Sequence, residues 1–80
     1  MNVTQLINEL DRMRVPKSFY SINDGLKTDA YILNYVYGRW EYFYFDEKGN
    51  RLDEKNFLNE EEAVEFFLKR IRNEMKYMRT

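Results

Sequence analysis

The feature that most constrains this fold is an aromatic stretch that runs from Asp29 to Asp46. It contains eight of the fourteen aromatic residues of the chain: Tyr31, Tyr35, Tyr37, Trp40, Tyr42, Phe43, Tyr44 and Phe45. Aromatic and β-branched residues favour strands, and Gly38 stands where two strands would meet in a tight turn. The stretch therefore predicts a β-hairpin.

A two-residue loop at Gly38-Arg39 would define how the two strands of this hairpin pair. The opposed pairs on one face would be Tyr37 with Trp40, Tyr35 with Tyr42, and Leu33 with Tyr44. The other face would carry Ile32, Val36, Phe43 and Phe45. A one-residue change in loop length would exchange the faces, because side chains alternate along a strand. We expect helices to cover one face and tyrosines of the other to meet solvent or a partner.

Two amphipathic helices are predicted, one at each end of the chain. In residues 2–14, apolar residues recur at helical spacing (Val3, Leu6, Ile7, Leu10, Met13), with Asn2 as N-cap and Pro16 beyond the end. The second helix follows Asn59, a predicted N-cap, and begins with three glutamates that suit the positive end of its dipole. Leu58 is expected to pack on Ala63 as a hydrophobic staple. The apolar stripe of this helix is Val64, Phe67, Leu68, Ile71, Met75 and Met78.

The remaining segments predict two short strands and their turns. Residues 19–22 form a strand candidate, followed by turn residues at 23–25 and a loop at 26–28. A turn at 46–50 leads to a polar strand at 51–57, which we expect at the sheet edge. The resulting prediction is a single α+β domain over residues 1–80: a small antiparallel sheet of three to four strands, with both terminal helices packed on one face.

The composition argues against catalysis. The chain has neither histidine nor cysteine, so the commonest general base, the commonest metal ligand and the thiolate nucleophile are all missing. The neighbouring carboxylates occupy turns, a strand edge and a helix start, where solvated acids are expected. We therefore expect no enzyme, no metal and no cofactor. The lack of cysteines, of a signal peptide and of a membrane-spanning segment suggests a cytoplasmic protein.

Charge is distributed unevenly along the chain. Residues 41–65 carry nine acidic and three basic side chains, whereas residues 66–80 carry one acidic and five basic side chains. Four of the acidic residues, Asp46, Glu47, Asp53 and Glu54, flank the second turn and are expected to form one acidic rim. We take these four with Tyr35, Tyr42 and Tyr44 as the candidate partner-binding residues. The alternative is that the charges only keep the sheet edge soluble.

Nucleic acid is a weaker candidate partner. The order of the predicted elements is also that of double-stranded-RNA-binding domains, and aromatic sheets can stack bases. However, those domains approach phosphates with a basic start to the second helix, whereas this helix starts with Glu60, Glu61 and Glu62. Only Arg39 is interleaved with the hairpin aromatics, so phosphate neutralisation would be poor.

Several stretches taken together resemble small immunity proteins of bacterial polymorphic or contact-dependent toxin systems. The stretches are Phe-Tyr-Ser-Ile-Asn-Asp-Gly-Leu (19–26), Ala-Tyr-Ile-Leu (30–33), Gly-Arg-Trp-Glu-Tyr-Phe-Tyr (38–44), Glu-Lys-Gly (47–49) and the segment 57–68. The chain departs from that group by having Glu-Lys-Gly for Glu-Arg-Gly and Val64 where cysteine often follows the helix-start alanine. The resemblance implies a protein that binds and neutralises a cognate toxin, which could be a nuclease. The alternative is a small interaction or regulatory module that forms a homodimer through an exposed aromatic sheet face.

Overall fold

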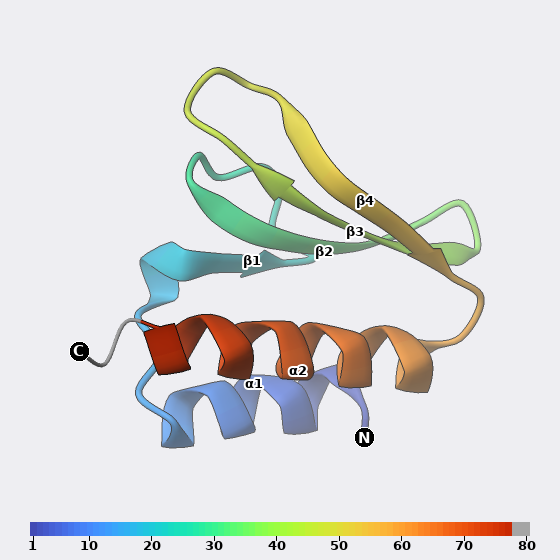
Figure 1. Cartoon of the computed structure of the whole chain (residues 1–80). Coiled ribbons are helices and arrows are strands. Elements are labelled where there is room, and N and C mark those ends of the chain that lie inside the picture. Colours follow the sequence, from blue (N-terminus) through green and yellow to red (C-terminus); the bar gives the residue numbers. More distant parts are fainter. Residues whose placement is uncertain (78–80) are drawn as a thin grey trace.

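The computed structural model describes residues 1–77, which form a four-stranded sheet with two helices on one of its faces (Figure 1). The elements in chain order are α1 (Val3–Arg12), a 3₁₀ turn (Lys17–Phe19), β1 (Tyr20–Ile22), β2 (Ala30–Val36), β3 (Arg39–Phe45), β4 (Arg51–Phe57) and α2 (Glu60–Tyr77). The strands lie in the order β1-β2-β3-β4. The predicted α+β class is confirmed. Met78, assigned to the apolar stripe of the second helix, lies outside the described residues.

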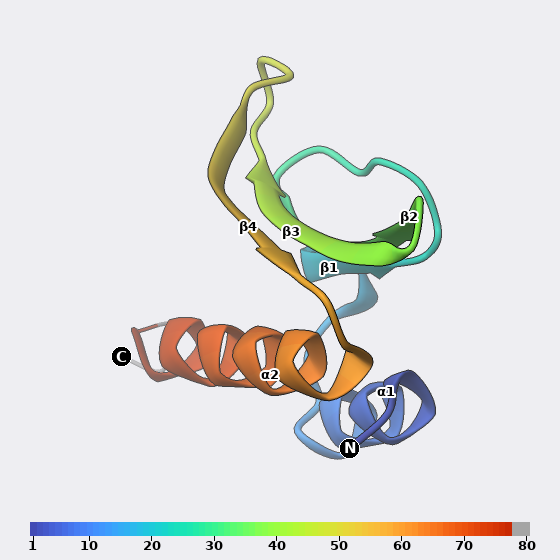
Figure 2. The same cartoon turned by 90° about the vertical axis from the view of Figure 1, so that its right-hand side faces the viewer.

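The sheet is mixed, so the prediction of a purely antiparallel sheet is wrong. β1 pairs with β2 in parallel, whereas β2–β3 and β3–β4 are antiparallel. Parallel neighbours need a connection that returns to the start of the first strand. Here the loop 23–29 makes that return, arching over the sheet face opposite the helices (Figure 2). So short a loop suffices because β1 has only three residues, about 10 Å of strand at roughly 3.3 Å per residue.

The β2–β3 hairpin turns at Tyr37-Gly38, one residue earlier than predicted. The observed pairs include Tyr35 with Trp40 and Leu33 with Tyr42, a shift of two residues from the predicted pairing. Because a shift of two leaves every side chain on its face, the predicted grouping into two faces is retained although the register is wrong. Both turn residues have positive φ, 52° for Tyr37 and 81° for Gly38. This geometry suits glycine, but the left-handed region costs an ordinary L-residue about 1–2 kcal/mol.

The main core lies between the helices and the face that carries Trp40. Its buried residues are Leu6, Leu10, Val15, Tyr20, Leu33, Trp40, Tyr42, Ala63, Val64, Phe67, Leu68 and Ile71. The opposite face holds a second, smaller cluster of Ala30, Ile32 and Phe43, with Phe45 packed against it. Both faces are therefore used for burial. The expectation that tyrosines of the uncovered face meet solvent or a partner is wrong, because the helices cover the face on which Tyr42 lies and the other face carries Ala30, Ile32 and Phe43.

Both predicted helix starts are confirmed. Asn2 forms a full capping box with Gln5: the Gln5 N–H donates to Asn2 Oδ1 (2.8 Å) and the Asn2 N–H donates to Gln5 Oε1 (2.9 Å). At α2 the Glu62 N–H donates to Asn59 Oδ1 (2.8 Å). The predicted staple at Leu58 is wrong, because this side chain is 86% exposed. Phe57 instead packs against the helix, with its ring 5.2 Å from that of Phe66.

α1 and α2 lie side by side and run in the same direction (Figures 1 and 2). Their first residues are joined because the Val3 N–H donates to Glu60 Oε2 (2.8 Å). Further along both helices, Arg72 Nη2 lies 3.4 Å from Glu9 Oε1. Parallel packing places both positive dipole ends at one end of the molecule and both negative ends at the other. Acidic residues Glu60, Glu61 and Glu62 occupy the first end, and basic residues Arg12, Arg72 and Lys76 the second. Neither helix, over the part of the chain described, is long and apolar enough to cross a membrane.

β4 is the polar edge strand that the sequence predicts. Six of its seven residues are exposed, and its pairing with β3 shifts register between Tyr42 and Tyr44. Asp53, at this irregularity, has a positive φ of 56°. A bulge and charged side chains both discourage another strand from adding to this edge.

Candidate protein-binding surface

Tyr42, one of the predicted partner-binding residues, is buried in the core and cannot present its side chain to a partner. It is only 1% exposed and its ring contacts Phe66 and Phe67 edge to face, at centroid distances of 5.0 and 6.0 Å. The prediction was wrong because the sequence could not show which sheet face the helices cover. Burial raises the pKa of the Tyr42 hydroxyl, which has no hydrogen-bond partner among the described residues.

Tyr44 lies on the same face as Tyr42 but is only half-buried. Its ring meets that of Tyr31 edge to face at 4.9 Å. Burial, followed by the nearby Glu74 carboxylate, raises the pKa of Tyr31. Tyr31 and Tyr44 thus form a packed pair between the sheet and the second half of α2, with only part of Tyr44 open to a partner.

The four acidic residues of the predicted rim have different surroundings. The Asp46 carboxylate accepts hydrogen bonds from the N–H groups of Lys48 (3.0 Å) and Asn50 (2.7 Å) and from Asn50 Nδ2 (3.1 Å). The Asn50 N–H bond is the main reason why the pKa of Asp46 is lowered. Asp53 Oδ2 lies 3.7 Å from Arg70 Nη2 on α2. Asp46 therefore shapes the loop, whereas Asp53, Glu47 and Glu54 are all exposed, with Asp53 directed at Arg70 on α2.

Tyr35 lies at the opposite end of the hairpin, and there the structure gathers exposed apolar side chains. Tyr35 is 55% exposed and packs against the buried Trp40 ring at 5.0 Å. Its backbone N–H donates to Asn23 Oδ1 (2.8 Å), which fixes this strand to the loop after β1. Leu58 is 86% exposed and Tyr37, in the turn, is 98% exposed. We call Tyr35, Tyr37, Trp40 and Leu58 the hairpin-tip surface.

Two shallow hollows mark the hairpin-tip surface. One, of about 440 Å³, is lined by Asn23, Tyr35, Trp40, Leu58 and Glu60. The other, of about 420 Å³, is lined by Asn23, Gly25, Asn34, Tyr35 and Val36. Tyr35 and Asn23 line both hollows. An exposed aromatic side chain with apolar neighbours and amide groups around it has the composition of a protein interface.

Sequence reasoning missed Tyr37 and Leu58 as surface residues. Tyr37 was assigned to a strand, yet a Tyr-Gly pair at this position is the signal of a two-residue turn whose first residue departs from the usual Asn or Asp. The sequence predicts that Leu58 packs on α2 as a hydrophobic staple. In the structure Phe57 makes the contact with α2 through Phe66, and the Leu58 side chain is left exposed.

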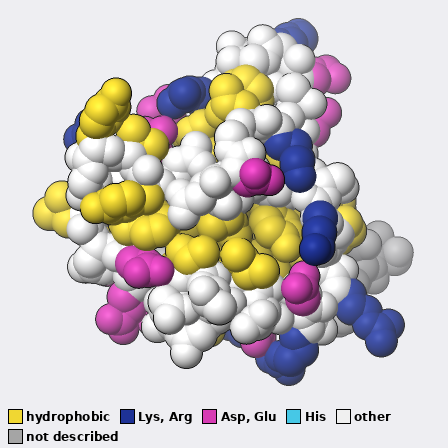
Figure 3. Space-filling model, turned by 180° about the vertical axis from the view of Figure 1, so that it is seen from behind, with side chains coloured by type: hydrophobic (Ala, Val, Ile, Leu, Met, Phe, Trp, Pro, Cys, Tyr) yellow, Lys and Arg dark blue, Asp and Glu magenta, His cyan; other side chains and the backbone are white. Residues whose placement is uncertain are grey.

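The start of α2 brings acidic charges to the hairpin-tip surface. Glu60 lines one hollow, and Glu61 and Glu62 follow it on α2. Arg39 lies next to the turn, and Asp24 shares a further hollow with the basic residues Lys17 and Lys27. Figure 3, which views the molecule from behind, shows apolar side chains at its left side with acidic side chains directly below them and most basic side chains towards the right. The glutamates at the start of α2 therefore favour a positively charged partner on that side of the surface.

A basic groove lies at the other end of the helices. It has a volume of about 330 Å³ and is lined by Glu9, Arg12, Met13, Arg72, Met75 and Lys76. Glu9 is paired with both Arg12 and Arg72, and the Arg12 hydrogen bond is the main reason why the pKa of Glu9 is lowered. The Glu9 carboxylate, which lines the groove, opposes phosphate binding there.

Within the described residues, no three potential metal ligands come together. Comparison with family models, curated proteins and solved structures yields no significant match to this chain.

Proposed function

We propose that this chain is an immunity-type protein, which binds a cognate bacterial toxin domain in the cytoplasm of the producing cell and neutralises it by stoichiometric association. The observation that carries the proposal is the hairpin-tip surface, where Tyr37, Leu58 and Tyr35 stay exposed beside a buried tryptophan. Such an inhibitor needs a rigid surface with anchors and requires no catalytic group. The sequence resemblance over residues 19–68 supports the same function.

The fold supports this proposal by holding the surface rigidly. Tyr35 is fixed by the ladder of β2 with β3 and by Asn23, while Leu58 is placed between the end of β4 and the capped start of α2. Aromatic residues dominate binding energy at protein interfaces, and a preorganised surface loses little conformational entropy on association. The acidic residues nearby would speed encounter with the basic cleft of a nuclease toxin.

The test is co-expression with the toxin domain encoded by the gene adjacent to this one in the source genome. We expect the chain to restore growth of cells that make the toxin and to form a one-to-one complex with the purified domain in light scattering. An unrelated neighbouring gene, or growth arrest in the presence of the folded chain, would contradict the proposal.

Self-association is the competing function, since the hairpin-tip surface could also bind a second copy. Light scattering of the free chain at increasing concentration distinguishes the two functions. A concentration-dependent dimer without toxin binding would favour the homodimeric module.

A further inference from the structure

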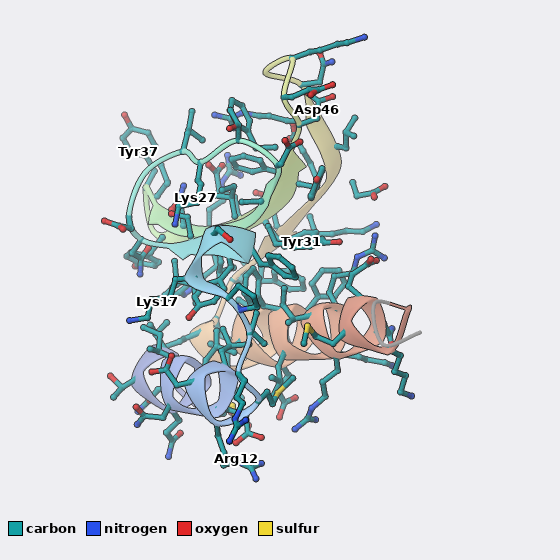
Figure 4. The ribbon with its side chains drawn as sticks, turned by 90° about the vertical axis from the view of Figure 1, so that its left-hand side faces the viewer. Arg12, Lys17, Lys27, Tyr31, Tyr37 and Asp46 are labelled. Carbon is teal, nitrogen blue, oxygen red and sulfur yellow. The ribbon has the colours of Figure 1, made fainter. Side chains whose placement is uncertain are left out.

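We propose that Tyr37 is the principal anchor for the protein partner, inserted from the hairpin turn into a pocket on a positively charged surface. This inference rests on the proposed function and deepens it by naming the residue that makes the contact and the chemistry of the surface that receives it. Figure 4 shows Tyr37 pointing out from the turn, away from the sheet and the helices.

Tyr37 contributes little to the stability of the fold. Its side chain is 98% exposed, so folding buries almost none of its apolar area. Its backbone has φ of 52°, in the left-handed region that disfavours a large L-residue, and it occupies the turn position where asparagine or aspartate is preferred. A residue that is unfavourable for both backbone conformation and solvation suggests selection for contact with another molecule.

Tyr37 lies in a narrow turn above a packed aromatic pair. Gly38 completes the turn without a Cβ, and an added Cβ would meet nothing within 4 Å, so the tip is narrow and open on that side. Tyr35, two residues before Tyr37, is packed on Trp40 and gives the tip a rigid aromatic base. A protruding tyrosine on a rigid base is suited to insertion into a pocket, because few degrees of freedom are lost when it binds.

The charge of the partner is indicated by the start of α2. Glu60 lines a hollow of the hairpin-tip surface and Glu61 and Glu62 follow it on the helix, whereas Arg39 stands beside the turn. These glutamates would repel nucleic-acid phosphates and anionic lipid headgroups, and they favour a basic protein surface. A positively charged protein with a tyrosine-sized pocket is therefore the partner that fits.

The experiment compares Tyr37→Asn with Lys48→Ala, a control in the exposed loop of the other hairpin. Binding to the toxin domain encoded by the adjacent gene is measured by calorimetry, and stability by thermal unfolding. Tyr37→Asn should raise the melting temperature, because asparagine suits this turn, and should weaken binding about 30-fold, the effect of losing an interface anchor. Lys48→Ala should bind as the parent does.

The outcomes separate this inference from the proposed function. A parent that binds and protects, together with a Tyr37→Asn variant of equal affinity, would overturn the role of Tyr37 and leave the proposed function standing. A parent that does not bind the toxin domain would overturn both. Parent binding to anionic phospholipid vesicles or double-stranded RNA that depends on Tyr37, or a Tyr37-dependent dimer, would overturn the assignment of a basic protein as the partner.

Discussion

The carboxylate of Glu60, the first residue of α2, accepts a hydrogen bond from the backbone N–H of Val3, the first residue of α1 (2.8 Å). One acidic side chain thus satisfies an N-terminal donor of the neighbouring helix while it lies at the positive end of its own. It also opposes the unfavourable proximity of two positive dipole ends, which parallel packing brings together. Glu60 therefore joins the two helices at the end of the molecule that carries the hairpin-tip surface.

Glu60→Ala should lower the free energy of unfolding by about 1–2 kcal/mol, because the Val3 donor loses a charged acceptor in a half-buried place. Urea unfolding measures the change. Glu61→Ala is the matched control, since it also removes one acid from the first turn of α2 but from an exposed position. Equal urea midpoints for the two variants would show that the contact with Val3 does not stabilise the helix pair.

Trp40→Ala should destabilise the chain far more than Tyr37→Ala. Trp40 is 7% exposed in the main core, and truncation of a buried tryptophan typically costs about 3–5 kcal/mol. Tyr37 is 98% exposed, and alanine keeps the same unfavourable φ, so its change should stay within about 0.5 kcal/mol. If urea titrations gave similar midpoints, the burial of Trp40 described above would be wrong.

The parts of the fold that the sequence predicts are those determined by local interactions. Asn2 and Asn59 cap helices through neighbours three residues away, and the polar composition of Arg51–Phe57 indicates an edge strand. The two faces of the hairpin are also predicted, because alternation survives a shift of two residues.

The parts that sequence reasoning missed depend on tertiary packing. Whether the helices cover Tyr42 or Phe43 is decided by how α1 and α2 dock, and both faces of the hairpin are apolar enough for either choice. The parallel pairing of β1 depends on the path of the loop 23–29. Turn residues in that loop predict a change of direction but do not indicate along which side of β2 the chain returns. For the candidate site, Tyr35 was predicted, whereas Tyr37 and Leu58 emerged only from their exposure in the structure.

Stability should fall at alkaline pH because tyrosines are buried. Burial raises the pKa of Tyr31, Tyr42 and Tyr20 in the folded chain, so above the ordinary tyrosine pKa of about 10 the unfolded state loses protons that the folded state keeps. The free energy of unfolding therefore decreases as pH rises through and beyond that value.

Urea unfolding at a series of pH values from about 8 to 11 tests this expectation. Tyr31→Phe should reduce the steepness of the decline, because it removes one group whose pKa is raised by burial and by Glu74. A parent stability that stays constant or increases over this range would contradict the expectation.

The last prediction distinguishes two acidic regions that could steer a basic partner. One pair, Glu47 and Glu54, remains from the predicted rim after Asp46 and Asp53 are assigned to the loop and to Arg70. The other pair, Glu61 and Glu62, lies at the start of α2 beside the hairpin-tip surface. Each pair can be converted to glutamine, so that the two double variants lose the same charge.

If the partner binds at the hairpin tip, Glu61→Gln/Glu62→Gln should slow association with the toxin domain and flatten its salt dependence. Glu47→Gln/Glu54→Gln should do so less, because charges act on the encounter mainly within a Debye length of the contact, about 8 Å at physiological salt. The dissociation rate should change little in either variant. The free energy of unfolding should change by no more than about 1 kcal/mol, mostly because the glutamates of α2 interact with its dipole. Stopped-flow kinetics at several salt concentrations measures both rates. A larger loss of association rate in the Glu47/Glu54 variant would place the steering field at the second hairpin, as the sequence predicts, and the hairpin-tip surface would then have to bind without electrostatic guidance.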